Sequence, residues 1–302
     1  MAHVVVIGSG LVGATAAFAI LHRGVAGRLT LSDVDEARAE GEAMDLAHAL
    51  PFLKNARIEA RRLADLRAAD LVVVCAGRNS VPGETRLDLL RDNALRMRSI
   101  AQALRAWPAP PLVLVVSNPV DVLTQVAWEE LGRPAGTVLG SGTVLDTARL
   151  KSLLGERFGL DPHSIHGYIL GEHGDSELAA WSTVAAGGLN VRKWPGFVAS
   201  EAEALFQKAR GAAYEIITRK RATYYAIGAV CAVIAEALLR DQRTILPVSV
   251  PSERRYGTEP VCLSLPCVLG RGGVERVIEP ELEAAEIAAL RRSSSVLARA
   301  IR

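Results

Sequence analysis

The first half of the chain alternates apolar strands with helical segments. The run HVVVIG near the start is continuous and apolar, which is typical of a parallel strand buried on both faces. A helical pattern follows it and ends near Gly24, and LTLSD then predicts a second strand. The alternation continues with a helix over 37–49 and a strand over 69–74. This order of elements predicts an α/β fold with a doubly wound parallel sheet.

The pattern changes in the second half. Helices are predicted over 202–218 and 224–239, and an amphipathic helix over 279–301 closes the chain. TILPVSV and VCLSLPCVLG predict a pair of strands joined by a turn. This half therefore adds long helices and paired strands to the alternating first half.

A glycine-rich turn joins the first strand to the first helix, and it reads Gly8-Ser9-Gly10-Leu11-Val12-Gly13. In this position, glycines allow a tight turn, the approach of a pyrophosphate to the backbone and close helix packing. Asp33 follows the second strand, about 20 residues after Gly13, where an acid would bind the ribose hydroxyls and repel a 2′-phosphate. Together, the turn and Asp33 predict a Rossmann-type sheet that binds NAD rather than NADP.

Two further strand ends are expected beside the cofactor, because ligands of open parallel sheets bind beyond the carboxyl ends of the strands. Ala76 and Gly77 follow one apolar strand, and Gly77 would let the backbone approach the cofactor. Asn118 follows the next apolar strand. With Pro119 as the first residue of a helix, Asn118 is either a simple N-cap or a group that also lies at the crevice.

Between those two strands, the loop RNSVPGETR leads into a helix that starts near Glu84. A loop that is rich in Gly and Pro and carries Arg86 can close over a substrate and exclude water. Alternatively, Arg86 is a solvated residue of the first helical turn. A cation fits that end of the helix dipole poorly, which favours a functional role.

The stretch from Leu145 to Glu177 gathers residues suited to acid/base chemistry. Asp146 and Arg149 lie on one face of a helix that begins at Asp146, and GEHGD places His173 at a turn after a short strand. A carboxylate on one ring nitrogen leaves the other nitrogen to move a proton, and a guanidinium can bind a substrate carboxylate with two hydrogen bonds. The simpler alternatives are a core histidine, a helix cap at Asp146 and a surface ion pair at Arg149.

Composition narrows the classes of protein. The 302 residues have a net charge of +2 and are 50% hydrophobic, which fits a globular protein without a basic surface for nucleic acid. We expect no targeting leader, and no membrane association, because no uncharged run is long enough for a span. The cysteines lack the spacing of a zinc site, so we expect reduced thiols, no metal and a cytoplasmic protein; they are Cys75, Cys231, Cys262 and Cys267.

These motifs resemble the L-lactate and L-malate dehydrogenase family over nearly the whole chain. The matching runs occur in the family's order: GSGLVG, PGETRLDLL, SNPVDVL, GSGTVLDTARL, GEHGDSE, ATYYAIG and LSLP. The resemblance implies an NAD-binding Rossmann domain over 1–142 and an α+β substrate domain over 143–302, whose helix near 225–240 packs back on the first domain. It also implies a homotetrameric, NAD-dependent oxidoreductase that acts on a small 2-keto or 2-hydroxy acid.

The resemblance also assigns roles near the nicotinamide. The residues of the catalytic step are the acid/base His173, its partner Asp146 and Arg86, which polarises the substrate carbonyl. The residues at the substrate are the carboxylate anchor Arg149, Asn118 near the carbonyl, Thr223 in the pocket wall and Ser80 in the loop.

The forms GEHGDSE and ATYYAIG are similar to the lactate branch of the family, which implies that pyruvate and L-lactate are the substrates. Ser80 stands where the lactate enzymes of the family usually carry Gln and the malate enzymes carry Arg. Without Arg, a second substrate carboxylate would be buried unpaired, which disfavours malate dehydrogenase activity. Because Ser is smaller than Gln, a relaxed-specificity 2-hydroxy acid dehydrogenase for bulkier 2-keto acids remains an alternative.

Many bacterial members of the family bind fructose 1,6-bisphosphate between subunits through an Arg and a His. His166 matches that histidine, but Lys151 stands at the arginine position. Lysine keeps the charge and lacks the planar fork, so weak binding, no binding and a purely structural His166 are all open.

The fold alone would also fit a non-catalytic NAD-binding sensor, because one fold hosts many functions. Arg86, Asp146, Arg149 and His173 together favour an enzyme, since a sensor has no use for a proton donor beside a carboxylate clamp. A short-chain dehydrogenase would carry Tyr-x-x-x-Lys, and no tyrosine of this chain has Lys four residues later.

Overall fold

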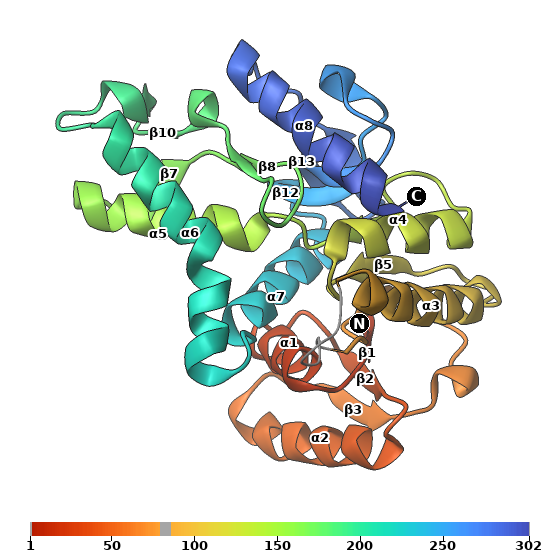
Figure 1. The fold of residues 1–302 in the computed structure, drawn as a ribbon. Helices are drawn as coiled ribbons and strands as arrows, with labels where there is room; N and C mark the ends of the chain where they lie inside the picture. Colours follow the sequence, from red (N-terminus) through yellow and green to blue (C-terminus); the bar gives the residue numbers. More distant parts are fainter. Residues whose placement is uncertain (1, 79–85, 302) are drawn as a thin grey trace.

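A computed structural model describes residues 2–78 and 86–301, shown in Figure 1. The first half supplies six strands of the central sheet within this part of the chain: β1 (His3–Ile7), β2 (Arg28–Ser32), β3 (Arg57–Ala60), β4 (Leu71–Val74), β5 (Leu112–Val115) and β6 (Val138–Gly140). They run parallel in the order β6-β5-β4-β1-β2-β3, the order of two mononucleotide-binding halves. The predicted doubly wound parallel sheet is confirmed.

Helices cover both faces of this sheet: α1 (Leu11–His22), α2 (Glu36–Ala49), α3 (Arg86–Arg105), α4 (Val120–Leu131) and, from the second half, α7 (Tyr225–Leu239). Successive side chains of β1 point to opposite faces. Val4 and Val6 join a buried cluster with residues of α1, α2 and α7, whereas Val5 and Ile7 join another with residues of α3 and α4. Burial on both faces explains why the run is apolar at every position.

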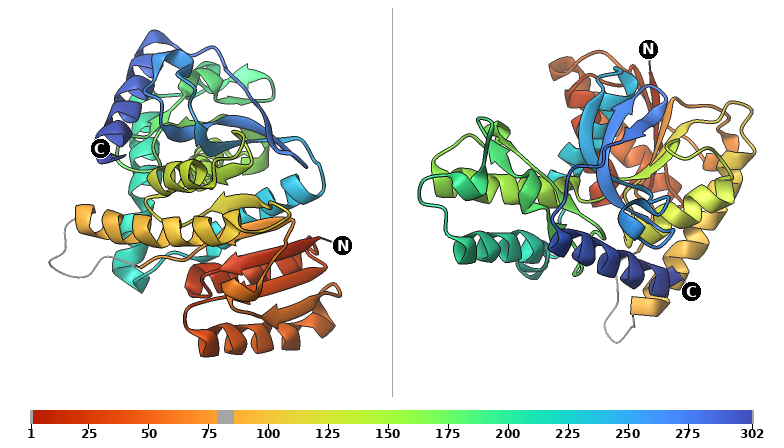
Figure 2. Two further views of the ribbon diagram at one scale, coloured as in Figure 1. Left: turned by 90° about the vertical axis from the view of Figure 1, so that its right-hand side faces the viewer. Right: turned by 90° about the horizontal axis from the view of Figure 1, so that it is seen from above.

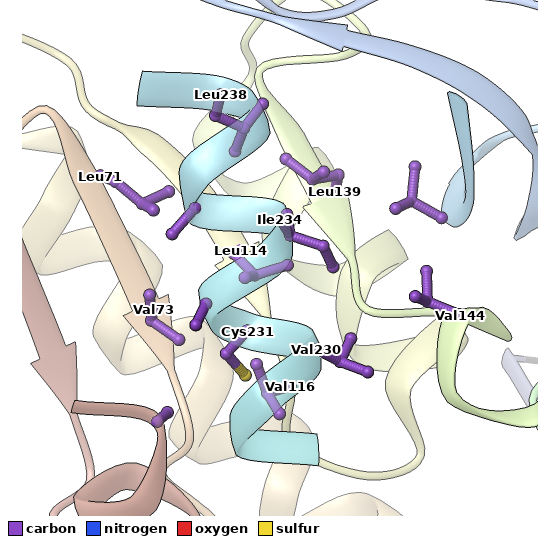
Figure 3. Close-up of a cluster of buried hydrophobic side chains, with 14 of the residues drawn as sticks. Leu71, Val73, Leu114, Val116, Leu139, Val144, Val230, Cys231, Ile234 and Leu238 are labelled. Carbon is purple, nitrogen blue, oxygen red and sulfur yellow. The ribbon is translucent and has the colours of Figure 1, made fainter. Parts of the chain in front are cut away.

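Helix α7 comes from the second half of the chain and packs beside α1 on one face of the sheet. Figure 3 shows Val230, Cys231, Ile234 and Leu238 packed among side chains of β4, β5 and β6. A Cβ at Gly228 would lie 2.6 Å from Cγ2 of Thr15, so glycine lets α7 approach α1 closely. A helix from the second half thus belongs to the core of the nucleotide-binding half.

Three strands of the second half extend the same sheet: β12 (Thr244–Pro251), β13 (Cys262–Gly270) and β14 (Gly273–Val277). The predicted pairing of β12 with β13 is confirmed, and it is antiparallel. β12 joins the parallel strands by pairing Ser249 with Gly140 of β6. One sheet therefore contains strands that come before and after residue 142 in the sequence. The division of the chain into two domains at that residue stays a prediction.

The rest of the second half forms a lobe beside the sheet, seen from above in Figure 2. It contains α5 (Val144–Phe158), α6 (Ala199–Lys220), β7 (Ile165–His166), β8 (Ile169–Leu170), β9 (Leu178–Ala179), β10 (Ala185–Ala186) and β11 (Leu189–Asn190). Leu154, Ile165 and Phe206 belong to its own buried cluster. The closing helix α8 (Ala284–Ile301) packs against α4 and β9.

Some local expectations differ from the structure. The prediction that Pro119 is the first helical residue is wrong, because α4 begins at Val120 and Pro119 is its extended N-cap, where a missing N–H costs nothing. The closing helix begins later than predicted, at Ala284, since Pro280 precedes it. β3 was not predicted: it is a short, half-buried edge strand with charged residues. Within the described ranges, no helix is long and apolar enough to cross a membrane.

Candidate active site

The glycine turn after β1 lies against the segment after β4. Gly8 has a φ of +93°, and a Cβ there would lie 2.5 Å from the backbone nitrogen of Ala76. A Cβ at Gly13 would lie 1.8 Å from the carbonyl oxygen of Gly8. Neither position has room for a side chain, and Gly8 also needs the left-handed conformation that glycine adopts without strain.

Replacing Gly13 by Ala is expected to destabilise the protein by about 1–3 kcal/mol, because the helix must move away from the turn. Thermal unfolding should show a lower Tm, and a fluorescence titration should show weakened NADH binding. Gly10→Ala is the matched control for the stability measurement alone, since a Cβ at Gly10 would find no protein atom within 4 Å but would enter the space expected for the phosphates. Equal stability of Gly13→Ala and Gly10→Ala would contradict the tight packing of helix on turn.

The start of α1 suits the pyrophosphate of a dinucleotide. Gly10 is its N-cap and offers no side-chain hydrogen bond, so the first N–H groups of the helix remain available to an anion. The open space beside Gly10 leaves room for the phosphates. Leu11 is exposed at the first position of the helix, and Val12 behind it is half-buried.

Asp33 lies at the end of β2, beside the same turn. Its Oδ2 accepts hydrogen bonds from the backbone nitrogen of Ser9 at 2.6 Å and from Oγ of Ser9 at 3.0 Å. Burial acts to raise the pKa of Asp33, but hydrogen bonds from the backbone of Asp35 and from Ser9 outweigh it and lower the pKa. An ionised acid here fits ribose hydroxyls and opposes a 2′-phosphate, so the residues present fit NAD.

Asn93 ties together the strand ends at the crevice, a role that sequence reasoning missed. This buried residue of α3 accepts from the backbone nitrogen of Arg78 at 3.1 Å and donates to the carbonyl oxygen of Asn118 at 2.9 Å. A Cβ on Gly77 would lie 3.5 Å from Oδ1 of Asn93, an ordinary contact, so the close approach of Gly77 to the cofactor stays a prediction. The side chain of Asn118 is exposed after β5.

His173, Asp146 and Arg149 come together where α5 meets the loop after β8. Oδ2 of Asp146 lies 2.6 Å from Nδ1 of His173, and Oδ1 of Asp146 accepts from Nη1 of Arg149 at 2.9 Å. Asp146 is only 2% exposed, and the side chain of Arg149 is 13% exposed. Asp146 is not a helix cap, because the N-cap of α5 is Thr143. Its contact with Arg149 is not a surface ion pair, because both side chains are largely buried.

Within this group, the opposite charges of Asp146 and His173 shift each other's pKa toward the charged form. Burial acts to lower the pKa of His173, but the charge of Asp146 and its hydrogen bond outweigh burial and raise the pKa to about 9. Burial likewise acts to raise the pKa of Asp146. The charges of His173 and Arg149, together with their hydrogen bonds, outweigh burial and lower this pKa. The structure therefore favours a protonated imidazole on an ionised carboxylate at neutral pH. Nε2 of His173 is the ring nitrogen left for proton transfer.

Asp121 holds the loop that carries His173, and sequence reasoning gave it no role. It lies in the first turn of α4, where its Oδ2 accepts from the backbone nitrogen of His173 at 2.7 Å and its Oδ1 from Oγ of Ser249 at 2.6 Å. Burial raises the pKa of Asp121 to about 6. One carboxylate thus connects α4, the His173 loop and β12.

Glu177 is a second buried carboxyl group near His173. One of its oxygens, one of Asp146 and a ring nitrogen of His173 all lie within 4.8 Å of one another. Such spacing is compatible with a metal ion, but Asp146 is already bonded to the cations His173 and Arg149. We therefore assign no metal to this group.

The structure describes three of the other predicted residues, Thr223, Lys151 and His166. Thr223 is half-buried between α6 and α7. Lys151 is half-buried on α5, where burial lowers its pKa, and His166 is exposed on β7, which packs against α5. Ser80 and the side chain of Arg86 lie outside the described residues, and α3 begins at Arg86.

A sheet of this strand order with a glycine turn at its centre defines a class, the dinucleotide-binding α/β proteins. Residues 2–140 match the family model of the lactate/malate dehydrogenase NAD-binding domain, and residues 143–302 match that of the lactate/malate dehydrogenase alpha/beta C-terminal domain. The chain belongs to the lactate/malate dehydrogenase family, and NAD is its cofactor.

Curated relatives and solved structures agree with this assignment. An L-lactate dehydrogenase of Synechococcus sp. (strain JA-3-3Ab) is 48% identical over 98% of this chain and 97% of its own, and one of Treponema denticola is 44% identical over 97% and 95%. The crystal structure of a lactate dehydrogenase from a Medee basin deep-sea metagenome library is 40% identical, with a TM-score of 0.96 over 99% of this chain and 98% of its own. The minor L-lactate dehydrogenase of Enterococcus mundtii is 39% identical with the same TM-score, over 99% and 97%.

Proposed function

We propose that this protein is an NAD-dependent L-lactate dehydrogenase, which interconverts pyruvate and L-lactate. The observation that carries the proposal is a buried carboxylate, Asp146, that contacts both the imidazole of His173 and the guanidinium of Arg149. Relatives named L-lactate dehydrogenase, 42–48% identical over nearly the whole chain, support these substrates. Neither the described residues nor these relatives favour malate or bulkier 2-keto acids as substrates, and Ser80, the residue that suggested bulkier substrates, lies outside the described residues.

In this proposal, Arg149 binds the substrate carboxylate and His173 donates the proton on Nε2 to the keto oxygen. Bound NADH supplies the hydride to the carbonyl carbon. Asp146 fixes the orientation of the ring through Nδ1 and stabilises the imidazolium before the proton leaves. In the reverse direction, neutral His173 takes the proton of the lactate hydroxyl. The roles of Arg86, Asn118 and Thr223 in polarising and enclosing the substrate stay predictions.

An NADH oxidation assay over a panel of 2-keto acids tests the proposal. Pyruvate is expected to give the highest kcat/KM among pyruvate, oxaloacetate, 2-ketobutyrate and phenylpyruvate. A higher value for oxaloacetate would replace the proposal with a malate dehydrogenase. A higher value for phenylpyruvate would favour the broader enzyme that Ser80 suggested.

The pH profile is expected to follow the charge of His173. Its pKa is raised to about 9, so kcat/KM for pyruvate should be level near neutral pH and fall as pH rises through about 9, where the proton is lost. Lactate oxidation needs the neutral ring and should rise over the same range. In Asp146→Asn, the fall for pyruvate should move down by about 1–3 pH units, because the opposite charge is gone. An unmoved alkaline limb would contradict the pairing.

We also propose that the enzyme is a cytoplasmic homotetramer. Exposed apolar side chains on α1 and α6, including Phe18, Tyr214 and Ile217, would suit subunit contacts. The free cysteines suit a reducing compartment. Sedimentation of the purified protein gives the subunit number, and a monomer would refute the assembly.

We further propose that any response to fructose 1,6-bisphosphate is weak. Lys151, at the position where the family carries an arginine, is half-buried and lacks the planar fork, whereas His166 is exposed. A titration of activity against fructose 1,6-bisphosphate measures the response. A strong, saturable activation would refute this proposal.

A further inference from the structure

Glu177 is a buried carboxyl group without a full set of partners. It is 5% exposed, and its Oε1 has no hydrogen-bond partner among the described residues. Buried polar atoms are nearly always paired, and an unpaired carboxylate oxygen is costly. The protonation state of Glu177 is therefore the first question that its environment raises.

The groups that face Glu177 come from three elements. Asp146 and Arg149 lie on α5, His173 lies on the same loop as Glu177, and Arg210 lies on α6. Both guanidinium groups are engaged elsewhere: Arg149 donates to Asp146, and Arg210 donates to the carbonyl oxygen of Asp175 at 3.0 Å. Neither of them hydrogen-bonds Glu177 among the described residues, so these two guanidinium groups act on Glu177 only through their charge.

Two charged groups lie beside Glu177, the carboxylate of Asp146 and the imidazole of His173. A carboxyl oxygen of Glu177 lies within 4.8 Å of a carboxylate oxygen of Asp146, and two carboxylates this close in a buried site do not both ionise readily. His173 and Arg149 hydrogen-bond Asp146 and stabilise its charge, whereas neither of them hydrogen-bonds Glu177 among the described residues. Burial first, and the charge of Asp146 second, raise the pKa of Glu177 to about 9 against the weaker effects of His173, Arg210 and Arg149.

We propose that Glu177 is a neutral carboxylic acid whose proton removes a negative charge from beside Arg149 and His173 and so favours binding of the substrate carboxylate. Glu177 lies next to Asp146 and His173, and its charge would also act on Arg149. An ionised Glu177 would weaken the attraction of these two cations for the substrate and would repel the substrate anion. The inference rests on the function proposed above and adds to it a residue that determines substrate affinity.

The pH dependence of substrate affinity tests the inference in wild type and Glu177→Gln. Gln has the shape of the neutral acid, so KM for pyruvate near pH 7 should equal that of wild type. Above pH 9, wild type loses two protons that favour the anion, from His173 and Glu177, and log KM should rise by about two per pH unit. Glu177→Gln loses only that of His173, and the slope should be about one.

The dissociation constant of oxamate, a non-reacting analogue of pyruvate, should show the same slopes. Glu172→Gln is the matched control, because this acid of the same loop accepts hydrogen bonds from Ser176 and is half-buried. It should keep the wild-type slope. Equal slopes in wild type and Glu177→Gln would overturn the inference, as would a loss of affinity of about tenfold or more in Glu177→Gln at pH 7.

Infrared difference spectroscopy gives a readout that needs no turnover. The spectrum of wild type minus Glu177→Gln near pH 7 should contain the C=O stretching band of a protonated carboxyl group. That band should disappear as pH rises through about 9. A carboxylate band at pH 7 would overturn the inference even in an enzyme that reduces pyruvate. Conversely, a protonated band in a protein without pyruvate turnover would leave Glu177 neutral and count against the proposed function alone.

Discussion

Replacing His173 by Gln is expected to lower kcat for pyruvate reduction by about three orders of magnitude, within the range that positioned acid/base groups contribute. An amide cannot supply a proton near neutral pH, so the keto oxygen would have to take one from water. The imidazolium charge is lost as well, which should also raise KM. Stopped-flow measurement of NADH oxidation in a single turnover isolates the chemical step from product release.

The matched control for this variant is His163→Gln. His163 is 95% exposed and pairs with Asp161 on the surface, so its replacement should leave kcat unchanged. NADH affinity should be unaffected in both variants, because the glycine turn and Asp33 lie on other elements. If His173→Gln keeps its turnover, or loses NADH binding instead, His173 is not the proton donor.

The parallel half of the fold follows from its local pattern, and the antiparallel extension does not. In β1, apolar residues at every position reveal a strand covered on both faces. The apolar runs of β12 and β13 likewise predict that these two strands pair with each other. Their sequence does not indicate which sheet they join. Only the structure shows which sheet they join: Ser249 of β12 pairs with Gly140 of β6, a strand far away in the sequence.

In the candidate site, too, contacts between residues close in sequence were predictable, and contacts between distant residues were not. Asp146 and Arg149 are three residues apart on a helix, so their contact is readable from the helical period. Asp121 reaches the backbone of His173 across 52 residues, a contact that no local pattern announces. Likewise, Glu177 looks like an ordinary surface acid in GEHGDSE, and only its burial beside Asp146 sets it apart. The roles of buried acids whose neighbours lie far away in the sequence therefore could not be predicted from local sequence patterns.

Replacing Arg149 by Lys is expected to lower kcat/KM for pyruvate by about two orders of magnitude, mostly through KM. Lysine keeps the charge but cannot form the two parallel hydrogen bonds of a guanidinium with a carboxylate, and the loss of one charge-assisted bond costs about 1.5–3 kcal/mol. The compact ammonium should also lie farther from Asp146, whose Oδ1 now accepts from Nη1 of Arg149 at 2.9 Å. Steady-state kinetics give KM, and oxamate binding should weaken in parallel.

Arg157→Lys is the control, because Arg157 lies on the same helix and pairs with Glu201 at the surface. It should leave KM unchanged. The alkaline limb of the pH profile distinguishes anchoring from a general disturbance of the site: Asp146 keeps its contact with His173 in Arg149→Lys, so the limb should stay near pH 9 while KM rises. A limb that moves together with KM would show that Arg149 acts mainly by holding Asp146. An unchanged KM would show that the substrate carboxylate binds elsewhere.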